Sequence, residues 1–311
     1  MRTPTYLSPT SIMLWGKDRM EFYRKYLAED RVPRMPQTSA MSVGSAFDAY
    51  IKNYLATCLG MPEANGDLDL DFLLTEQVEV GNRDFAFAAG LDCFNQYKKL
   101  GATAELIKEL ERSDGVSFEH TVQATVNDIV PLLGKPDLYY WADGVLHIYD
   151  WKVNGYCSQR GASPRKGYVR LLTSGKPAKV HKDARPVEGV CVVNNLEDLD
   201  VSWATQLCIY AWVLGGFDCS MVAGIDQLAC KPTPSGVSIR VAALRNRIGS
   251  DFAANLWAQC LTIWERISVG EIFDSENEST MASLDTEAAA YVTDGGAWED
   301  WYTTSMRSHK Y

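Results

Sequence analysis

The chain has 311 residues, of which 46% are hydrophobic and 23% are charged, and its formal net charge is −10. Such a length allows one large domain or two modest ones, and such a composition is ordinary for a soluble globular protein. The negative charge excludes a protein that coats nucleic acid by charge alone, while it still permits an enzyme with a local basic cleft.

The N-terminal third shows helical periodicity. Its first residues lack the apolar core of a secretory signal, and the chain contains no run of about 18 apolar residues, so we expect a cytoplasmic protein without a membrane span. Ser8 and Pro9 suit the N-cap and the first position of a helix over residues 6–30. Further helices are expected over residues 42–60 and over 83–112, where a glycine interrupts the pattern.

Residues 116–195 show the patterns of β-strands. Apolar and polar residues alternate over residues 116–126, which predicts a half-buried strand. Two more strands are expected over residues 129–142 and 144–153, joined by the turn Ala-Asp-Gly, and a fourth over residues 187–195.

The rest of the chain predicts a helix, a hairpin and a second helix. The helix is expected over residues 198–216, the closing hairpin over 221–244 and the final amphipathic helix over 251–273. The tail to Tyr311 is rich in Trp and Tyr but has no clear period. This order of elements indicates an α/β (α+β) chain in which a central mixed sheet is flanked by helices.

Two acids and a lysine stand at the ends of the central predicted strands. Asp137 and Asp150 each close an apolar or aromatic run, and Lys152 follows two places later on the same strand face as Asp150. If the strands pair across the Ala-Asp-Gly turn, one register places Asp137 opposite Ile148 and diagonal to Asp150. Two carboxylates at such a short distance favour a hard divalent cation between them. A lysine beside the cation can stabilise negative charge on a phosphorus centre. The pattern therefore suggests metal-assisted phosphodiester cleavage.

The same residues have an ordinary interpretation, in which each acid is a turn or cap residue and the D-x-K sequence is a solvated surface pair. The order of motifs nevertheless resembles the PD-(D/E)XK nuclease superfamily, with Pro136-Asp137 followed by Asp150-Trp151-Lys152. The chain is similar to the RecB-like and phage-type exonuclease branch in four further segments, which are LSPTSIMLW…EFYRKYL, VGSAFDAYIK, GKPD and QLCIY.

The resemblance implies a fold and a domain organisation. The expected fold is a restriction-endonuclease-like core, with a central mixed sheet flanked by helices and a helical N-terminal portion. Residues 1–311 would form one nuclease domain. Its parts would be a helical portion (1–112), a catalytic core (113–245) with a basic insertion (160–185), and a C-terminal helix and tail (246–311).

The resemblance also implies roles for individual residues. The ligands of a Mg²⁺ or Mn²⁺ ion would be Asp137, Asp150 and the backbone carbonyl of Trp151. Lys152 would be the catalytic lysine. Gln206 and Tyr210 are four residues apart and share one helix face, which the family places beside the active site and the nucleic-acid strand. Their alternative roles are a capping glutamine and a core tyrosine.

Two further acids are candidate ligands. Asp48 stands where the branch often carries a histidine, so it would bind the ion as a hard ligand, mark a weakened site, or simply be exposed on its helix. Glu119 lies in the first predicted strand, where relatives often carry an acid. Some relatives hold an iron–sulfur cluster through one early and three late cysteines. The eight cysteines of this chain lack that spacing, so we expect no cluster.

A basic segment lies between the predicted catalytic strand and the helix that carries Gln206. Residues 160–185 contain one acid among many basic residues, which predicts contact with DNA phosphates; a solvated surface loop is the alternative. The basic residues are Arg160, Arg165, Lys166, Arg170, Lys176, Lys179, Lys182 and Arg185.

Together these features predict a divalent-metal-dependent nuclease of a bacterial or phage-infected host cytoplasm. The favoured version is an exonuclease that acts on DNA ends in recombination, repair or phage DNA metabolism. The resemblance also suggests a single-strand annealing protein as a partner, and homo-oligomers. The alternatives are a structure-specific endonuclease and a non-catalytic DNA-binding or assembly module that retains the fold.

Overall fold

The structure of the chain is a computed structural model. It describes in full residues 1–31, 33–162, 195–217, 219–234 and 236–273. Between residues 163 and 194 it describes the backbone of three short strands, 168–171, 177–180 and 189–191. The Trp- and Tyr-rich tail after residue 273 and the side chains of most of the predicted basic segment lie outside the described residues.

The first predicted helix is broken into pieces. Helix α1 (Pro9–Lys17) begins at Ser8, whose hydroxyl accepts a hydrogen bond from a backbone N–H of the first turn, as the sequence predicts. It ends at Asp18, whose carboxylate caps the short helix α2 (Arg19–Phe22), and a π-helical turn (Tyr23–Leu27) follows. One continuous helix over residues 6–30 is therefore wrong, because Asp18 stops one helix and starts the next.

Four helices form the rest of the N-terminal portion, three of them in regions predicted to be helical and one, over residues 70–77, between those regions. Gly101 has a φ of +82° and separates the last two, which confirms the predicted interruption. The helices are α3 (Ser39–Cys58), α4 (Leu70–Gln77), α5 (Arg83–Lys99) and α6 (Ala102–Leu110), with 3₁₀ turns at Pro62–Asn65 and Val80–Asn82.

A five-stranded sheet with the order β1-β4-β5-β9-β10 forms the centre of the fold. Its strands pair antiparallel except β5 and β9, which run parallel. The prediction of an α/β chain with a central mixed sheet, flanked by helices and preceded by a helical portion, is confirmed. The strands are β1 (Asp114–Phe118), β4 (Leu138–Ala142), β5 (Val145–Asn154), β9 (Met221–Thr233) and β10 (Gly236–Asn246).

The two long strands predicted before β5 are each broken in two. The chain turns at Glu119, whose φ is +54°, so that β2 (Val122–Val126) leaves the central sheet. It pairs with β3 (Val130–Gly134) in a separate two-stranded sheet, and Lys135-Pro136-Asp137 then leads back to β4. Proline cannot continue a strand ladder, which accounts for the second break.

The described part of the fourth predicted strand, β8 (Gly189–Cys191), lies outside the central sheet. It pairs with β6 (Tyr168–Leu171), which also pairs with β7 (Pro177–Val180). After a 3₁₀ turn at Leu196–Asp198, the predicted helix is confirmed as α7 (Val201–Gly215) and the last one as α8 (Ser250–Val269).

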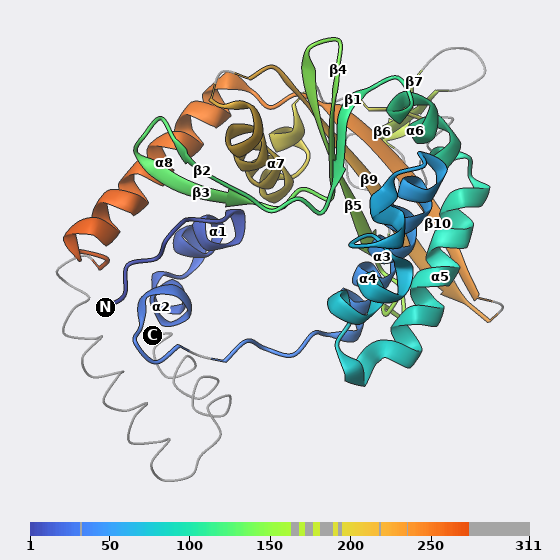
Figure 1. Cartoon of the computed structure of the whole chain (residues 1–311), viewed down its shortest axis with the longest axis horizontal. Coiled ribbons are helices and arrows are strands. Elements are labelled where there is room, and N and C mark those ends of the chain that lie inside the picture. Colours follow the sequence, from blue (N-terminus) through green and yellow to red (C-terminus); the bar gives the residue numbers. More distant parts are fainter. Residues whose placement is uncertain are drawn as a thin grey trace, which may run out of the picture.

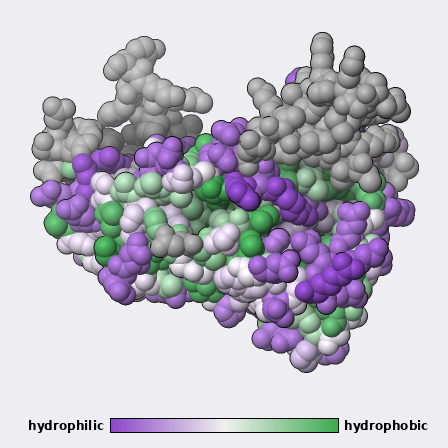
Figure 2. All heavy atoms as spheres, turned by 90° about the horizontal axis from the view of Figure 1, so that it is seen from above, coloured by the Kyte–Doolittle hydropathy of each residue, from purple (hydrophilic) through white to green (hydrophobic). Residues whose placement is uncertain are grey.

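Helices cover both faces of the central sheet (Figure 1). One layer consists of α3, α4, α5 and α6, whose apolar side chains pack with those of Tyr149 and Trp151 from β5. Helix α7 packs on the other face, next to α1, α8 and the β2–β3 hairpin. Seen from above, hydrophilic and hydrophobic residues are interspersed over the surface (Figure 2). Among the described helices, none has the length and apolarity needed to cross a bilayer.

Candidate active site

The β4–β5 hairpin fixes the positions of the two acids. Asp143 and Gly144 form its two-residue loop with φ values of +51° and +75°, so Ala142 pairs with Val145 and Leu138 with Tyr149. Continued by one residue, this register places Asp137 directly opposite Asp150. The predicted register, with Asp137 opposite Ile148, is therefore wrong by two residues. A register shift of two residues keeps every side chain on the same face of the sheet, so Asp137 and Asp150 still lie close together, as predicted.

Asp137 and Asp150 are close enough to perturb each other. Burial alone would raise the pKa of Asp137, but the Lys52 ammonium, the contact with Asp150 and a 3.1 Å hydrogen bond from the Trp151 N–H lower it to about 2. Burial and the charge of Asp137 raise the pKa of Asp150 to about 8. Asp150 is buried and Asp137 is part-exposed beside it, so the two carboxylates compete for positive charge in one place, which is a setting that favours a cation.

Lys152 links Asp150 to helix α7. Its ammonium donates to Asp150 Oδ2 at 2.6 Å and to Gln206 Oε1 at 2.9 Å, and Gln206 Nε2 donates to the Tyr210 hydroxyl at 2.9 Å. Burial opposes the charge of Lys152, but Asp150 and Asp137 outweigh it and raise its pKa. The structure therefore brings these five sequence-predicted residues into one connected group.

Helix α7 reaches this group because Gly134 has no side chain. A Cβ at that position would lie 2.8 Å from Tyr210 Cδ1 and 2.8 Å from Val213 Cγ2. The glycine of the GKPD segment thus allows β3 and α7 to approach closely. The segment thus contains both the glycine that permits this close packing and the acid Asp137, three residues later.

Asp48 and Glu119 join the same cluster. Carboxylate oxygens of Asp48, Glu119 and Asp137 lie within 4.8 Å of one another, which is a spacing that a metal ion can bridge. Asp48 is on α3, yet its side chain is only 16% exposed, so it does not lie on the exposed side of that helix. Burial raises the pKa of Asp48 well above its usual value, and its Oδ1 is buried without a hydrogen-bond partner among the described residues.

These residues fit a hard divalent cation. All candidate side-chain ligands are carboxylates, and such oxygen-only sets favour Mg²⁺ or Mn²⁺ over zinc or copper. The unpartnered Oδ1 of Asp48 leaves an acceptor that such an ion would satisfy. Whether the Trp151 carbonyl is a further ligand remains a prediction.

Sequence reasoning missed Lys52, which lies in the middle of the cluster. Its side chain is fully buried, and its ammonium contacts Asp48, Glu119 and, at 3.4 Å, Asp137. Burial would lower the pKa of Lys52, but these three carboxylates raise it. A signal was present in the sequence, because Lys52 follows Asp48 by one helical turn.

Other polar side chains hold Glu119 in place. Gln77 Nε2 donates to Glu119 Oε1 at 3.1 Å, and Lys135 forms an ion pair with Oε2 from the solvent side. The net effect of these contacts and of Lys52 is a lowered pKa of Glu119, although burial alone would raise it. Glu119 therefore stays ionised and oriented toward Asp48 and Asp137.

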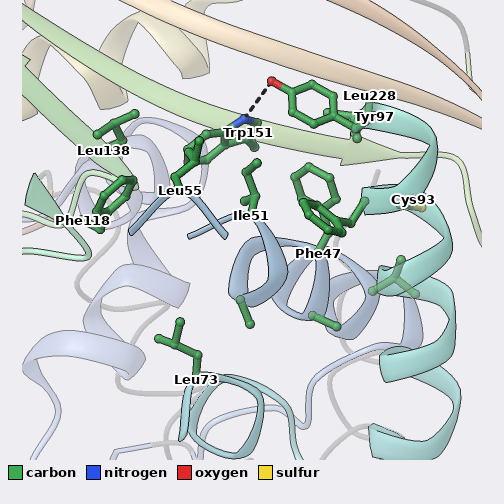
Figure 3. Close-up of a cluster of buried hydrophobic side chains, with 14 of the residues drawn as sticks. Phe47, Ile51, Leu55, Leu73, Cys93, Tyr97, Phe118, Leu138, Trp151 and Leu228 are labelled. Atoms are coloured by element: carbon green, nitrogen blue, oxygen red, sulfur yellow. Dashed lines mark hydrogen bonds between the residues drawn. The ribbon is translucent and has the colours of Figure 1, made fainter. Parts of the chain in front are cut away.

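The reverse side of β5 anchors the D-W-K segment. The Trp151 side chain points into the layer of α3 and α5, where its Nε1 donates to the Tyr97 hydroxyl at 3.3 Å (Figure 3). The Tyr97 hydroxyl contacts Asp226 Oδ2 at 2.5 Å, and Arg245 donates to the other oxygen of Asp226 at 3.0 Å. Trp151 is thus held from behind by a buried polar chain, while its neighbours on either side, Asp150 and Lys152, face the cluster.

Of the predicted DNA-binding residues, the structure describes only the side chain of Arg160, which is exposed. The side chains of Arg165, Lys166, Arg170, Lys176, Lys179, Lys182 and Arg185 lie outside the described residues. Their predicted role stays a prediction.

No known family model matches the chain, and no curated protein matches it. Among solved structures, a protein from Eubacterium rectale described as a candidate exonuclease is 14% identical, with a TM-score of 0.40 and coverage of 86% of this chain and 82% of that one. A second structure, of the protein SSO0001, is 10% identical, with a TM-score of 0.23 and coverage of 82% and 86%. At these scores neither structure assigns a function to this chain.

Proposed function

We propose that the chain is a PD-(D/E)XK nuclease that hydrolyses DNA phosphodiester bonds with a bound Mg²⁺ or Mn²⁺, and that residues 1–311 form one nuclease domain. The observation that carries the proposal is the meeting of Asp137 and Asp150 across the β4–β5 hairpin, with Lys152 bonded to Asp150 at 2.6 Å. An ordinary solvated D-x-K pair would be exposed, whereas Asp150 is 2% exposed here.

In this proposal each residue has a distinct task. Asp137, Asp150 and Asp48 would hold the ion, and Glu119 would add negative charge to the cluster beside it. When bound, the ion would polarise a phosphoryl oxygen and make a bound water a better nucleophile at neutral pH. Lys152 would place a positive charge where negative charge develops on the phosphate. Gln206 fixes the direction of Lys152 through its 2.9 Å hydrogen bond, and Tyr210 fixes Gln206 in turn.

We favour exonuclease action on DNA ends over structure-specific endonuclease action, on the resemblance of the motifs to the phage-type branch. A linear and a covalently closed circular duplex of the same sequence separate the two. Release of mononucleotides from the linear DNA alone fits the exonuclease. Cleavage of the circle, or cutting at a junction within it, fits the endonuclease.

One observation favours a non-catalytic DNA-binding module instead. Lys52 and Lys152 already neutralise part of the acidic cluster, so the cluster can persist without a metal ion. Such a module would bind DNA equally with and without Mg²⁺ and would release no nucleotides.

The first test is hydrolysis of end-labelled linear DNA with Mg²⁺ and with a chelator. We expect hydrolysis only with the ion, and a loss of about 10²- to 10⁴-fold in Lys152→Ala, because the positive charge at the phosphate is removed. Lys99→Ala, at the exposed end of α5, is the control and should retain the wild-type rate. Hydrolysis that survives both the chelator and Lys152→Ala would contradict the proposed mechanism.

The basic segment should contribute through phosphate contacts. Each phosphate contact adds about 0.7 to 0.9 to the slope of log affinity against log salt, so changing Arg160, Arg165 and Lys166 to glutamine should flatten that slope by about 2 to 3. Binding is measured by fluorescence anisotropy at several salt concentrations. The control changes Lys99, Lys108 and Arg112, which are exposed on or just after α5 and α6, by the same charge. Equal slopes for both variants would show that the segment is only a solvated loop.

A further inference from the structure

Lys52 occupies an unusual position for a lysine. It is fully buried on α3, whereas lysines are almost never fully buried unless they are paired. Its ammonium contacts the same three carboxylates, Asp48, Glu119 and Asp137, whose oxygens lie close enough together to bind a metal ion. The ammonium is therefore located where a metal ion bound by these three carboxylates would lie.

Asp137 connects two halves of the cluster. Its Oδ1 is directed to Lys52, at 3.4 Å, and its Oδ2 accepts the Trp151 N–H on the side of Asp150. In two-metal phosphoryl-transfer sites the ions lie about 3.5–4 Å apart. A carboxylate between two such positions would bridge them, and here one of those positions holds an ammonium.

We propose that Lys52 takes the place of a second metal ion, so that the chain binds one divalent ion, on the Asp150 side of Asp137. This inference rests on the proposed function. A divalent ion among Asp48, Glu119 and Asp137 would have to displace Lys52 or accept close repulsion from it. The buried ammonium provides positive charge to these acids without the binding of a second ion.

The charges of the cluster agree with one ion. With all four carboxylates ionised, as they would be around a bound cation, Asp48, Glu119, Asp137 and Asp150 face the two ammonium groups of Lys52 and Lys152. Two negative charges remain, and one divalent ion neutralises them. Lys135 contacts the outer oxygen of Glu119 and is 52% exposed, so solvent screens its contribution.

The test counts Mn²⁺ bound per chain by equilibrium dialysis and by electron paramagnetic resonance. Wild type should bind one ion. Lys52→Met, which keeps the apolar stem and removes the ammonium, should bind two and show the signal of a coupled Mn²⁺ pair. Lys135→Met removes one charge from the same Glu119 without opening the centre, so it should bind one ion.

Two ions in wild type, or one in a folded Lys52→Met variant, would overturn the inference and leave the nuclease proposal intact. No bound Mn²⁺ in any of the three proteins would overturn the proposed metal-dependent function itself, and the inference with it. Circular dichroism checks the fold of each variant. If Lys52→Met does not fold, the wild-type count and the anomalous Mn²⁺ peaks of a wild-type crystal still decide, because a peak among Asp48, Glu119 and Asp137 contradicts the inference.

Discussion

Asp137→Asn is expected to lower the rate of DNA hydrolysis by about 10³-fold or more. Asp137 contacts Lys52, accepts the Trp151 N–H and lies opposite Asp150, so it connects both halves of the cluster. An amide keeps the volume of the side chain but loses its charge. It therefore ligates a divalent ion poorly, and it withdraws the charge that holds Lys52 near the site.

The measurement is the initial rate on end-labelled linear DNA, together with the dissociation constant of Mn²⁺, which should rise. Asp143→Asn is the matched control, because it is the same change six residues away, in the exposed hairpin loop. Asparagine tolerates the φ of +51° found there, so this variant should keep the wild-type rate and stability. Equal rates for the two variants would remove Asp137 from the proposed mechanism.

The closeness of Asp137 and Asp150 could be predicted, because the alternation of side chains along a strand determines which residues share a face even when the pairing register is uncertain. The residue order D-W-K alone places Asp150 and Lys152 on one side of β5 and Trp151 on the other. The register could not be predicted as well, because it depends on loop length. The sequence interpretation left four residues between Tyr140 and Val145, whereas the left-handed conformations of Asp143 and Gly144 close the loop with two.

Two other features could not be predicted from local patterns in the sequence. The alternation over residues 116–126 is continuous in sequence, but the chain turns at Glu119 and divides it between two sheets. Lys52 has one partner nearby in sequence, Asp48, and two that are 67 and 85 residues away. A helical pattern therefore indicates the first contact only, and the fold supplies the other two.

Gly90→Ala should reduce the free energy of unfolding by about 2–3 kcal/mol, because the helices α3 and α5 approach each other closely there. A Cβ on Gly90 would lie 2.6 Å from Ala46 Cβ and 2.8 Å from the backbone N of Phe47. Backbone cannot move aside as a flexible side chain can, so α3 must shift. Since α3 also carries Asp48 and Lys52, the shift should weaken Mn²⁺ binding as well as stability.

Gly44→Ala separates this steric effect from the intrinsic effect of replacing a helical glycine. Gly44 lies on α3 with nothing within 4 Å of its added Cβ, so alanine should stabilise the protein by about 0.5–1 kcal/mol through the lower entropy of its unfolded chain. Urea unfolding of both variants gives the two free energies. Opposite signs are expected. A stabilised Gly90→Ala would contradict the close packing of α3 on α5, and with it the placement of Asp48 and Lys52 against β5.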